Sequence, residues 1–284
     1  MSEKLLTVGM ATYDDFDGVY FSVQALKMYH DIFKTNDVEI IVVDNNPDGK
    51  HGQKVSGFIK NWAKSTYIPY NGKKSTSIRE QIFANAKGKY TICMDCHVFL
   101  EKGSIESLLD YYGKNPNCKD IISGPMLYDD LHNVSTEFSP VWRDSMYGIW
   151  HTNTQALQNN VPFEIKMMGL GVFSCETKNW VRFNENFKGF GGEEGYIHEK
   201  FRIYGGKAIC IPQFKWLHRF ARPDGVKYPL ILEDRIWNYF VGWLELTGNP
   251  EHEMILSAYD HFKSKIPKGS IDNILNNAKQ IYGF

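Results

Sequence analysis

The sequence predicts an α/β protein whose mostly parallel sheet is flanked by helices on both faces. Apolar runs typical of buried strands lie at residues 5–12, 38–43 and 89–95. Segments with apolar residues at helical spacing separate these runs, the first of them around residues 19–33. Strands that alternate with helices form parallel sheets, and the ligands of such sheets bind beyond the carboxyl ends of the strands.

The first hundred residues alternate regularly between strand and helix patterns. After the strand at 5–12, an acidic loop leads into the first helix, and the strand at 38–43 ends on Asp44. The next predicted elements are a helix at 55–62, a short strand near 67–68, a helix at 78–86 with Gly88 as its C-cap, and the central strand at 89–95. This order begins with the βαβ unit of a parallel sheet.

An aromatic-rich stretch interrupts the pattern in the second hundred residues. It follows a helix capped by Ser104 and a strand at 121–125, and it extends over residues 126–160. It suits either a lobe that binds sugars, peptides or bases, or a core filled with rings. The rings are those of Tyr128, Phe138, Trp142, Tyr147 and Trp150.

Glycines mark the later elements. Residues 163–174 include two glycines, which permit a bulge or a close approach of the backbone to a ligand. A glycine turn at 190–192 opens a helix that Gly205 closes, and residues 207–212 are expected to form an edge strand. Helical spacing from Trp237 onward predicts packing helices. We therefore expect a single large domain with a C-terminal helical extension.

Composition limits the classes of partner. The 284 residues include 32 Lys and Arg against 33 Asp and Glu, so a formal net charge of −1 draws the chain to neither nucleic acid nor a membrane. A basic cluster at residues 50–74 is read as a solvated surface. Five cysteines without disulfide-like spacing indicate a reducing compartment. With no apolar run long enough to span a bilayer, we expect a cytoplasmic protein without a membrane partner.

The motif Asp95-Cys96-His97 ends the central apolar run. Side chains alternate along a strand, so Asp95 and His97 lie on the same side and can face one metal ion. A carboxylate oxygen and an imidazole nitrogen bind a divalent first-row ion at about 2.0–2.2 Å and leave positions open for a diphosphate. The motif therefore predicts a metal site for a transferase with an activated phosphate leaving group.

Other interpretations of this stretch carry less weight. Asp95 and His97 are also ordinary polar residues for the end of a strand, a role that needs no metal. Cys93-x-x-Cys96-His97 is formally a haem attachment motif, but Cys93 lies inside an apolar run, whereas haem attachment needs an exposed context. A structural zinc site would need a second cysteine pair.

Polar residues at the ends of several predicted strands indicate a nucleotide site. Thr12, Asp14, Asp44 and Asp95 follow strands whose carboxyl ends meet at one edge of the sheet. A carboxylate there can bond a ribose or a base N–H, and Arg79 can neutralise a phosphate. An aspartate after a strand is also a common turn residue, so the concurrence of these residues carries the prediction.

Two adjacent carboxylates, Glu193 and Glu194, are expected in the first turn of the later helix. The helix dipole favours acidic residues there by about 0.3–1 kcal/mol, which is a sufficient structural reason for both. In the functional interpretation, one accepts a hydrogen bond from an acceptor hydroxyl and the other serves as a general base. A metal held by Asp95 and His97 needs a third protein ligand, for which His218 is the candidate.

In their order along the chain, these motifs resemble those of GT-A glycosyltransferases, in particular the polypeptide N-acetylgalactosaminyltransferases and other family 2-like enzymes. The family's Asp-x-His metal motif and upstream arginine are matched by Asp95, His97 and Arg79. The resemblance covers about residues 5–220. Its remaining matches are the turn Gly191-Gly192-Glu193, the pair Gly205-Gly206, Pro212 and His218.

The resemblance implies a Rossmann-like GT-A catalytic domain at 1–220, with a nucleotide-binding half at 1–100 and an acceptor-binding half at 101–220, and a helical extension at 221–284. It implies a UDP-sugar donor and a cofactor ion, Mn²⁺ or Mg²⁺. The implied ligands of the ion are Asp95, His97 and His218, and the implied catalytic residues are Glu194, Glu193 and Arg79. The implied nucleotide-sugar contacts are Thr12, Tyr13, Asp14, Asp44, Arg79, Asp95, Gly191 and Gly192.

The sequence departs from the family pattern in three ways. It shows no membrane anchor and stem, no C-terminal lectin domain, and Glu194 where the retaining enzymes carry asparagine. Inverting relatives place a carboxylate base at this second position, so Glu194 suits a direct displacement, whereas a retaining reaction needs no such base. The sequence leaves the stereochemistry open. The missing targeting elements favour a bacterial or viral enzyme.

The motifs thus predict a metal-dependent glycosyltransferase that moves a sugar from UDP to a hydroxyl acceptor. A glycan, a protein Ser or Thr, and a hydroxymethylated DNA base are the acceptor classes, the last because of the basic cluster and the aromatic stretch. A nucleotidyltransferase is one alternative, but such enzymes usually open with a glycine-rich loop that residues 7–17 lack. A non-catalytic module that binds nucleotide or carbohydrate is the other. The sequence names neither the sugar nor the oligomeric state.

Overall fold

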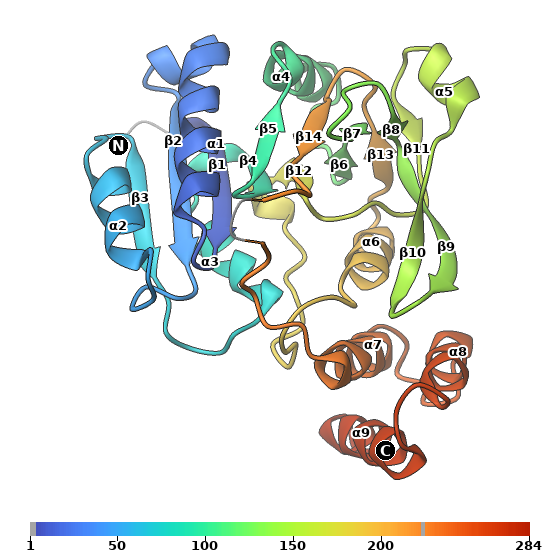
Figure 1. The fold of residues 1–284 in the computed structure, drawn as a ribbon. Coiled ribbons are helices and arrows are strands. Elements are labelled where there is room, and N and C mark those ends of the chain that lie inside the picture. The colour runs from blue at the N-terminus through green and yellow to red at the C-terminus, as the bar shows by residue number, and fades with distance from the viewer. Residues whose placement is uncertain (1–3, 223–224) are drawn as a thin grey trace.

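An eight-stranded mixed sheet forms the centre of the molecule (Figure 1). The computed structural model describes residues 4–222 and 225–284, and the strand order is β11-β13-β6-β12-β4-β1-β2-β3. The four strands from β4 to β3 in this order pair in parallel, which confirms the predicted α/β class with a mostly parallel sheet. They are β1 (Lys4–Thr12), β2 (Val38–Asp44), β3 (Ser65–Pro69) and β4 (Gly88–Asp95).

The other half of the sheet comes from the second hundred residues. β6 (Ile121–Ser123) and β13 (Ala208–Cys210) pair in parallel, whereas β12 (Val172–Glu176) runs antiparallel to β4 and β6. β13 lies between β6 and the two-residue β11 (Phe163–Glu164). The prediction of an edge strand at 207–212 is therefore wrong.

Two further details differ from the sequence prediction. β12 does not show the apolar run of a buried strand, because two of its five residues, Ser174 and Glu176, are polar although they are buried. Gly88 begins β4 instead of capping the preceding helix, α3 (Glu80–Asn85). A Cβ at Gly88 would lie 2.3 Å from the backbone nitrogen of Thr7, so only glycine lets β4 approach β1 at this point.

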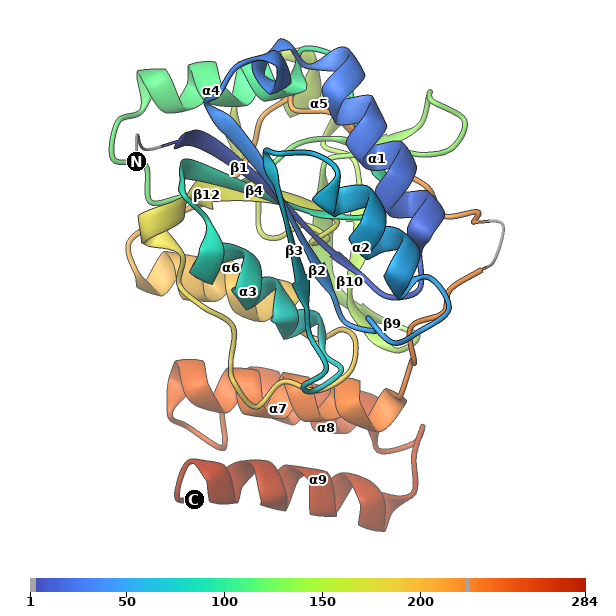
Figure 2. The ribbon, with the colours of Figure 1, turned by 90° about the vertical axis from the view of Figure 1, so that its left-hand side faces the viewer.

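Helices cover both faces of the sheet (Figure 2). α1 (Phe16–Tyr29) and α2 (Gly52–Lys60) lie on one face, and α3 and α6 (Glu194–Ile203) lie on the other. α1 begins after Asp15, whose Oδ1 accepts a hydrogen bond from the backbone N–H of Gly18 at 2.9 Å. This side-chain cap orients Asp15 at the carboxyl edge of the sheet.

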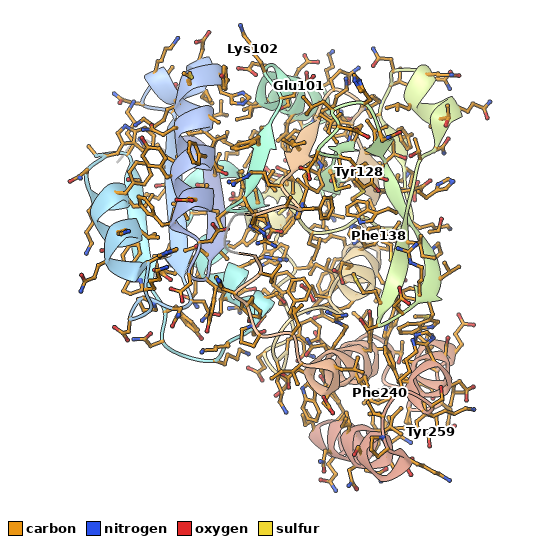
Figure 3. The ribbon with its side chains drawn as sticks, viewed as in Figure 1. Glu101, Lys102, Tyr128, Phe138, Phe240 and Tyr259 are labelled. Carbon is orange, nitrogen blue, oxygen red and sulfur yellow. The ribbon has the colours of Figure 1, made fainter. Side chains whose placement is uncertain are left out.

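A hairpin organises much of the aromatic-rich stretch. β9 (Glu137–Arg143) and β10 (Met146–His151) pair antiparallel, and Phe138 lies on the side that faces the centre of the molecule (Figure 3). A four-stranded sheet with the order β5-β14-β7-β8 lies beside it. Its strands are β5 (Val98–Leu100), β7 (Met126–Leu127), β8 (Val134–Ser135) and β14 (Trp216–His218).

The remaining helical elements before α7 are short or peripheral. α4 begins after Gly103, which adopts a left-handed conformation with a φ of 89°, so Ser104 is its first residue and not its cap. The elements in question are η1 (Asp31–Lys34), η2 (Thr76–Arg79), α4 (Ser104–Lys114), α5 (Thr154–Gln158) and η3 (Thr177–Asn179).

Three C-terminal helices form a layer of their own against α6 (Figures 1 and 2). They are α7 (Leu232–Thr247), α8 (Glu253–Phe262) and α9 (Lys268–Ile281), and Phe240 lies between α7 and α9 (Figure 3). No helix within the described part of the chain has both the length and the apolarity that a membrane span requires.

Trp142 ties the hairpin to this helical layer. Its indole N–H donates to Oγ of Ser257 at 2.8 Å, and its ring contacts those of Tyr239 and Phe262. This part of the aromatic stretch therefore fills a core between the hairpin and the C-terminal helices.

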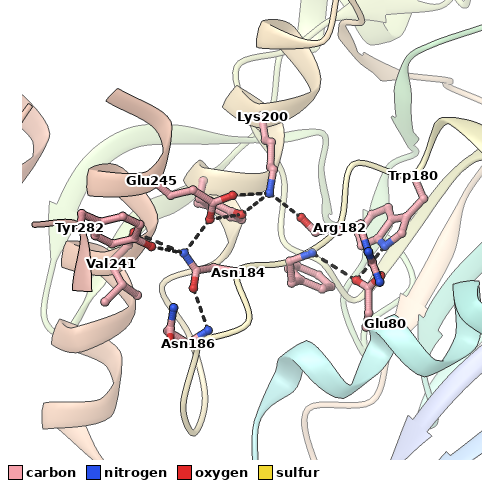
Figure 4. A network of polar contacts seen from close by, with 11 residues as sticks. Glu80, Trp180, Arg182, Asn184, Asn186, Lys200, Val241, Glu245 and Tyr282 are labelled. Carbon is pink, nitrogen blue, oxygen red and sulfur yellow. Dashed lines mark hydrogen bonds and ion pairs between the residues drawn. The ribbon is translucent and has the colours of Figure 1, made fainter. Parts of the chain in front are cut away.

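A polar network joins α6 to α7 and to the end of the chain (Figure 4). Nζ of Lys200 on α6 donates to Glu245 on α7 at 2.5 Å and to Oη of Tyr196 at 2.7 Å. Asn184 donates to the same glutamate at 2.6 Å and to Oη of Tyr282 at 2.7 Å. Since Lys200 is buried, these bonds fix the position of α6 against the helical layer.

Candidate active site

A cavity of about 360 Å³ opens beyond the carboxyl ends of β1 and β4, where a parallel sheet is expected to bind its ligand. The loop after β1, η2, the turn after β4, the start of α6 and β14 all contribute to its wall. The predicted site residues that line it are Thr12, Tyr13, Asp14, Arg79, Asp95, His97, Glu193, Glu194 and His218. Asp44, Gly191 and Gly192 do not line it.

The three predicted metal ligands converge on one wall of the cavity. Asp95 ends β4, His97 follows it, and His218 ends β14, which pairs with β5. Nε2 of His97 and Nε2 of His218 each lie 3.9 Å from Oδ2 of Asp95. Their ligand atoms all fall within 4.8 Å of one another, so the three side chains form a compact set of donors.

The chemistry of this donor set fits a divalent ion. Two ligand atoms that each lie about 2.1 Å from one ion are at most about 4.2 Å apart, a limit that both carboxylate–imidazole separations meet. Burial lowers the pKa of His218 to about 4, so its imidazole is neutral near pH 7, the form that binds a metal. One carboxylate and two imidazoles suit Mn²⁺ and leave positions for other oxygens.

Asp15 orients the imidazole of His97. Nδ1 of His97 lies 3.3 Å from Oδ2 of Asp15 and 3.2 Å from Nη1 of Arg222. Burial would raise the pKa of Asp15, but hydrogen bonds from His97 and Gly18 lower it to about 2. Since Asp15 can only accept and the guanidinium of Arg222 can only donate, the tautomer with its proton on Nδ1 donates to Asp15 and keeps Nε2 free on the side of Asp95.

Arg79 bridges the metal ligands and the two glutamates. It is buried at the end of η2, with Nη2 3.5 Å from Oδ1 of Asp95 and Nη1 3.8 Å from Oε1 of Glu193. Burial opposes its charge, but Asp95 and Glu193 raise the pKa of Arg79, so the guanidinium stays ionised. Within the described chain, Nη1 makes no hydrogen bond, so its contact with Glu193 is an ion pair alone. Because Arg79 lines the cavity, its charge suits an anion bound there.

Glu193 and Glu194 differ in their surroundings although they are adjacent. Glu193 is the N-cap of α6, so only Glu194 lies in the first turn, and the prediction that both do is wrong. Burial and the charge of Glu193 raise the pKa of Glu194 to about 8, against the opposite effects of Arg79 and Arg235. The site thus contains one carboxylate paired with arginine and one carboxyl group suited to proton transfer near neutral pH.

Asn45 and Thr76 form a polar corner of the cavity beside β2. The amide N–H groups of Asn45 donate to the carbonyls of Tyr70 and Lys73, both at 3.3 Å, which fixes the orientation of the amide. Oδ1 of Asn45 and Oγ1 of Thr76 are buried and find no hydrogen-bond partner among residues 4–222 and 225–284. Such atoms suit the N–H and O–H groups of a ligand.

Asp44, the predicted nucleotide contact, makes its bonds inside the protein. Oη of Tyr67 donates to its Oδ2 and the backbone N–H of Asn46 donates to its Oδ1, both at 2.9 Å. Asp14 lines the cavity, yet it accepts hydrogen bonds from the Asn46 side chain and the His51 backbone. The structure therefore brings Asp14 to the site as a residue that shapes the loop.

Gly191 and Gly192 face α7. Both have left-handed backbone conformations, with φ of +91° and +89°. A Cβ at Gly191 would lie 2.5 Å from Nε of Arg235, and one at Gly192 would lie 3.0 Å from Cβ of Asn238. The glycine pair thus permits both the turn and the close packing of α7 against it.

Aromatic rings form another wall of the cavity. Phe138, Trp150 and Trp216 line the cavity, and the rings of Phe138 and Trp150 meet edge to face at 4.4 Å. A Cβ at Gly169 or Gly171 would lie 2.8 Å from the indole ring of Trp150 or Trp216, respectively. The two glycines that the sequence marks therefore make room for these indoles.

Several residues that line the cavity were not predicted from the sequence. Asp15 looks like an ordinary helix cap, and Asn45 and Thr76 like loop residues, because their unpaired atoms appear only in three dimensions. Arg222 and Tyr228 come from the segment after β14 and lie beside His97 and Tyr13. Charge and aromaticity are their only signals in the sequence.

Comparison with known proteins places this geometry in a family. Residues 7–176 match the model of glycosyl transferase family 2. None of the curated protein sequences compared with the chain matches it. The structure is similar to that of GalNAc-T7 with UDP, GalNAc and Mn²⁺, with a TM-score of 0.72 and 15% identity over 99% of this chain and 55% of the other. The chain thus spans about half the length of GalNAc-T7.

Two further solved structures share the fold. TarS 1-349 from S. aureus in complex with UDP-GlcNAc has a TM-score of 0.63 and 12% identity over 98% of this chain and 80% of its own. The mannosyltransferase PcManGT from Pyrobaculum calidifontis, in complex with GDP-Man and Mn²⁺, has a TM-score of 0.55 and 12% identity over 99% of this chain and 76% of its own. Since the family model covers more than half of the sequence, the chain belongs to glycosyl transferase family 2.

Proposed function

We propose that this chain is a metal-dependent glycosyltransferase that moves a sugar from a UDP-sugar to a hydroxyl group of an acceptor. The observation that carries the proposal is the convergence on one cavity of three side chains with the geometry of metal ligands, a buried arginine and a carboxyl group of raised pKa. These are the groups that a displacement with a diphosphate leaving group requires.

The donor would bind between the metal ligands and the polar corner of Asn45 and Thr76. A divalent ion, Mn²⁺ or Mg²⁺, bound by Asp95, His97 and His218 would supply electrostatic stabilisation of the diphosphate. Similar structures were determined with UDP and Mn²⁺, with UDP-GlcNAc, and with GDP-Man and Mn²⁺, which supports a nucleotide-sugar donor and a metal. The two UDP complexes favour UDP.

Glu194 would act as the general base of an inverting reaction. Its carboxylate would take the proton of the acceptor hydroxyl while that oxygen forms a bond to the anomeric carbon and the bond from this carbon to the diphosphate oxygen breaks. Arg79 would stabilise the negative charge on the departing UDP, and Glu193, held by Arg79, would accept a hydrogen bond from the acceptor. An anomeric configuration opposite to that of the donor, measured by NMR of the product, tests this stereochemistry.

The acceptor would approach along the wall of Phe138, Trp150 and Trp216, because flat rings stack on sugars, peptides and bases alike. The proposal therefore keeps three acceptor classes: a glycan, a protein Ser or Thr, and a hydroxymethylated base of DNA. DNA binding weakens steeply with salt, because phosphate contacts release counterions, whereas glycan binding does not. Transfer to each class measured at two salt concentrations separates them.

We also propose the domain division that the motifs imply. Residues 1–100 would bind the nucleotide and 101–220 the acceptor within one catalytic domain, and 221–284 would form the helical extension. The five cysteines are free and buried, which supports a cytoplasmic enzyme.

Hydrolysis of UDP- and GDP-sugars tests the proposed reaction. Glycosyltransferases can transfer sugar to water, so manganese-dependent release of UDP from one donor would identify the donor. The release should be lost in Asp95→Asn while the protein stays folded. A chain that releases no nucleotide from any donor, and binds none in calorimetry, would instead be a non-catalytic module, and a chain that forms nucleotide-sugar from nucleoside triphosphate would be a nucleotidyltransferase.

A further inference from the structure

We infer that α7 of the C-terminal layer positions the carboxylates of the proposed reaction through Asn238 and Arg235, and that the glycine pair at 191–192 exists to accept this helix. The inference rests on the proposed function, since it assigns these two residues a role in placing Glu193 and Glu194. Neither Asn238 nor Arg235 lines the cavity, so both are positioning residues.

Asn238 binds the backbone of the turn that leads to the two glutamates. Its amide N–H groups donate to the carbonyls of Lys188 at 2.7 Å and Gly191 at 2.8 Å, and its Oδ1 accepts from the backbone N–H of Lys188 at 2.8 Å. The side chain is completely buried. A buried amide with three bonds to one turn fixes that turn in a single orientation.

Arg235 holds the same turn from the preceding turn of α7. Its Nε donates to the carbonyl of Phe190 at 3.2 Å, and its guanidinium lies over the Phe190 ring. Nη1 donates to the carbonyl of Ser145 at 3.3 Å, in the loop that joins β9 to β10. Arg235 therefore connects the turn before α6 with the hairpin that carries Phe138 and Trp150.

Tyr239 completes the second of these connections. Its Oη accepts a hydrogen bond from the backbone N–H of Tyr147 at 2.8 Å, again in the hairpin. Arg235, Asn238 and Tyr239 are spaced i, i+3 and i+4, so they share one face of α7. This face contacts two cavity walls at once, the one with the candidate base and the one with the aromatic rings.

The turn is built to receive this face. Gly191 and Gly192 need positive φ, and each would meet α7 if it carried a Cβ, at Nε of Arg235 and Cβ of Asn238. Since neither glycine lines the cavity, close approach of the backbone to a ligand does not account for them. Docking of α7 accounts for both the conformation and the missing side chains.

The experiment compares turnover with nucleotide binding in two variants. Asn238→Asp keeps the size of the side chain but removes the N–H donors, and Asn238→Ala removes all three bonds. We expect kcat to fall about tenfold to a hundredfold, as for a misplaced catalytic group, while the Kd for UDP with Mn²⁺ changes less than about twofold. Amide hydrogen exchange at residues 188–195 should accelerate in both variants.

Thr247→Val is the matched control. Thr247 lies on the same helix and donates to the carbonyl of Trp243 at 2.7 Å, away from the turn, so its loss should leave kcat and exchange at 188–195 unchanged. A kcat close to that of the wild type in both Asn238 variants, with unchanged exchange, would overturn the inference. So would a parallel loss of kcat and UDP affinity, which indicates general destabilisation. If Asn238→Ala does not fold, the same measurements on Asn238→Asp test the inference.

The outcomes also separate this inference from the proposed function. A wild-type chain without transferase or hydrolase turnover would refute the proposed function. In that case the hydrogen exchange of the Asn238 variants still determines whether α7 holds the turn. An active wild type, together with Asn238 variants whose hydrogen exchange at residues 188–195 does not change, would refute only the role of α7.

Discussion

Nη1 of Arg79 lies 3.8 Å from Oε1 of Glu193, and neither side chain is more than 7% exposed. The contact joins η2 to the N-terminus of α6. On its other side, the same guanidinium lies 3.5 Å from Asp95. One buried cation therefore sets the distance between a candidate metal ligand and a candidate catalytic carboxylate.

Replacement of Arg79 by methionine should impair both stability and activity. Loss of one partner leaves Glu193 buried without its counter-charge, and breaking a buried pair in this way costs about 3–5 kcal/mol. We expect a free energy of unfolding lower by about this amount in urea titration, and kcat/KM for donor hydrolysis lower by about 10²-fold or more.

Arg182→Met is the control for this change. Arg182 pairs with Glu80, but its side chain is 76% exposed, so its loss should change the free energy of unfolding by less than about 1 kcal/mol. Equal effects of the two arginine variants on stability would contradict the assigned role of the buried pair.

Replacement of His218 by alanine should weaken metal binding. It removes one of three protein ligands, so we expect the Kd for Mn²⁺, measured by titration of the free-ion EPR signal, to rise by about 10-fold or more. Chelation should abolish turnover of the wild type, and added Mn²⁺ should restore it. His132, in an exposed turn, provides the control: His132→Ala should bind Mn²⁺ as the wild type does. Unchanged Mn²⁺ affinity in His218→Ala would exclude it as a ligand.

The pH dependence of turnover should reflect Glu194. Burial and the Glu193 charge raise its pKa, and a general base acts in its deprotonated form, so kcat should rise with pH above the range usual for a glutamate. Glu194→Gln should remove this rise together with the activity. A kcat that is flat between pH 5 and 8, within about twofold, would show that another group accepts the proton.

The same group makes a separate prediction for stability. Because the pKa of Glu194 is raised in the folded state, the folded chain holds the proton in a pH range where the unfolded chain has lost it. The contribution of Glu194 to stability therefore falls as the pH rises from its ordinary value of 4.5 toward 8. Glu194→Gln should be more stable than the wild type at pH 8 and similar at pH 4, as measured by thermal unfolding.

The predictability of the site follows from the kind of signal that each residue leaves in the sequence. Asp95 ends a mostly apolar run, so the sequence places it at the carboxyl end of the central strand, and the parallel sheet follows from the same runs. The alternation of a strand does not account for His97, because Cys96 and His97 form the turn between β4 and β5. β12 and the hairpin lack such periodicity, because buried polar residues and half-exposed rings replace it. Tyr67, which contacts Asp44, and the residues that contact the glycine pair lie far from them in the sequence, so the spacing of residues along the chain does not predict these contacts.

Asn45 should contribute more to nucleotide binding than its neighbour Asp44. Its amide is held by two backbone carbonyls, and its buried Oδ1 has no hydrogen-bond partner in the described chain, whereas both oxygens of Asp44 already accept hydrogen bonds. Loss of one uncharged hydrogen bond is worth about 0.5–1.5 kcal/mol, so Asn45→Ala should raise the Kd for UDP about 2-fold to 10-fold in calorimetry. Asn71→Ala, which removes an exposed amide bonded to Asp48, should leave the Kd unchanged.

Asp44→Asn should affect thermal stability more than UDP affinity, because it disturbs the bonds to Tyr67 and Asn46. The opposite result, with UDP affinity lost in Asp44→Asn and kept in Asn45→Ala, would show that Asp44 and not Asn45 contacts the nucleotide.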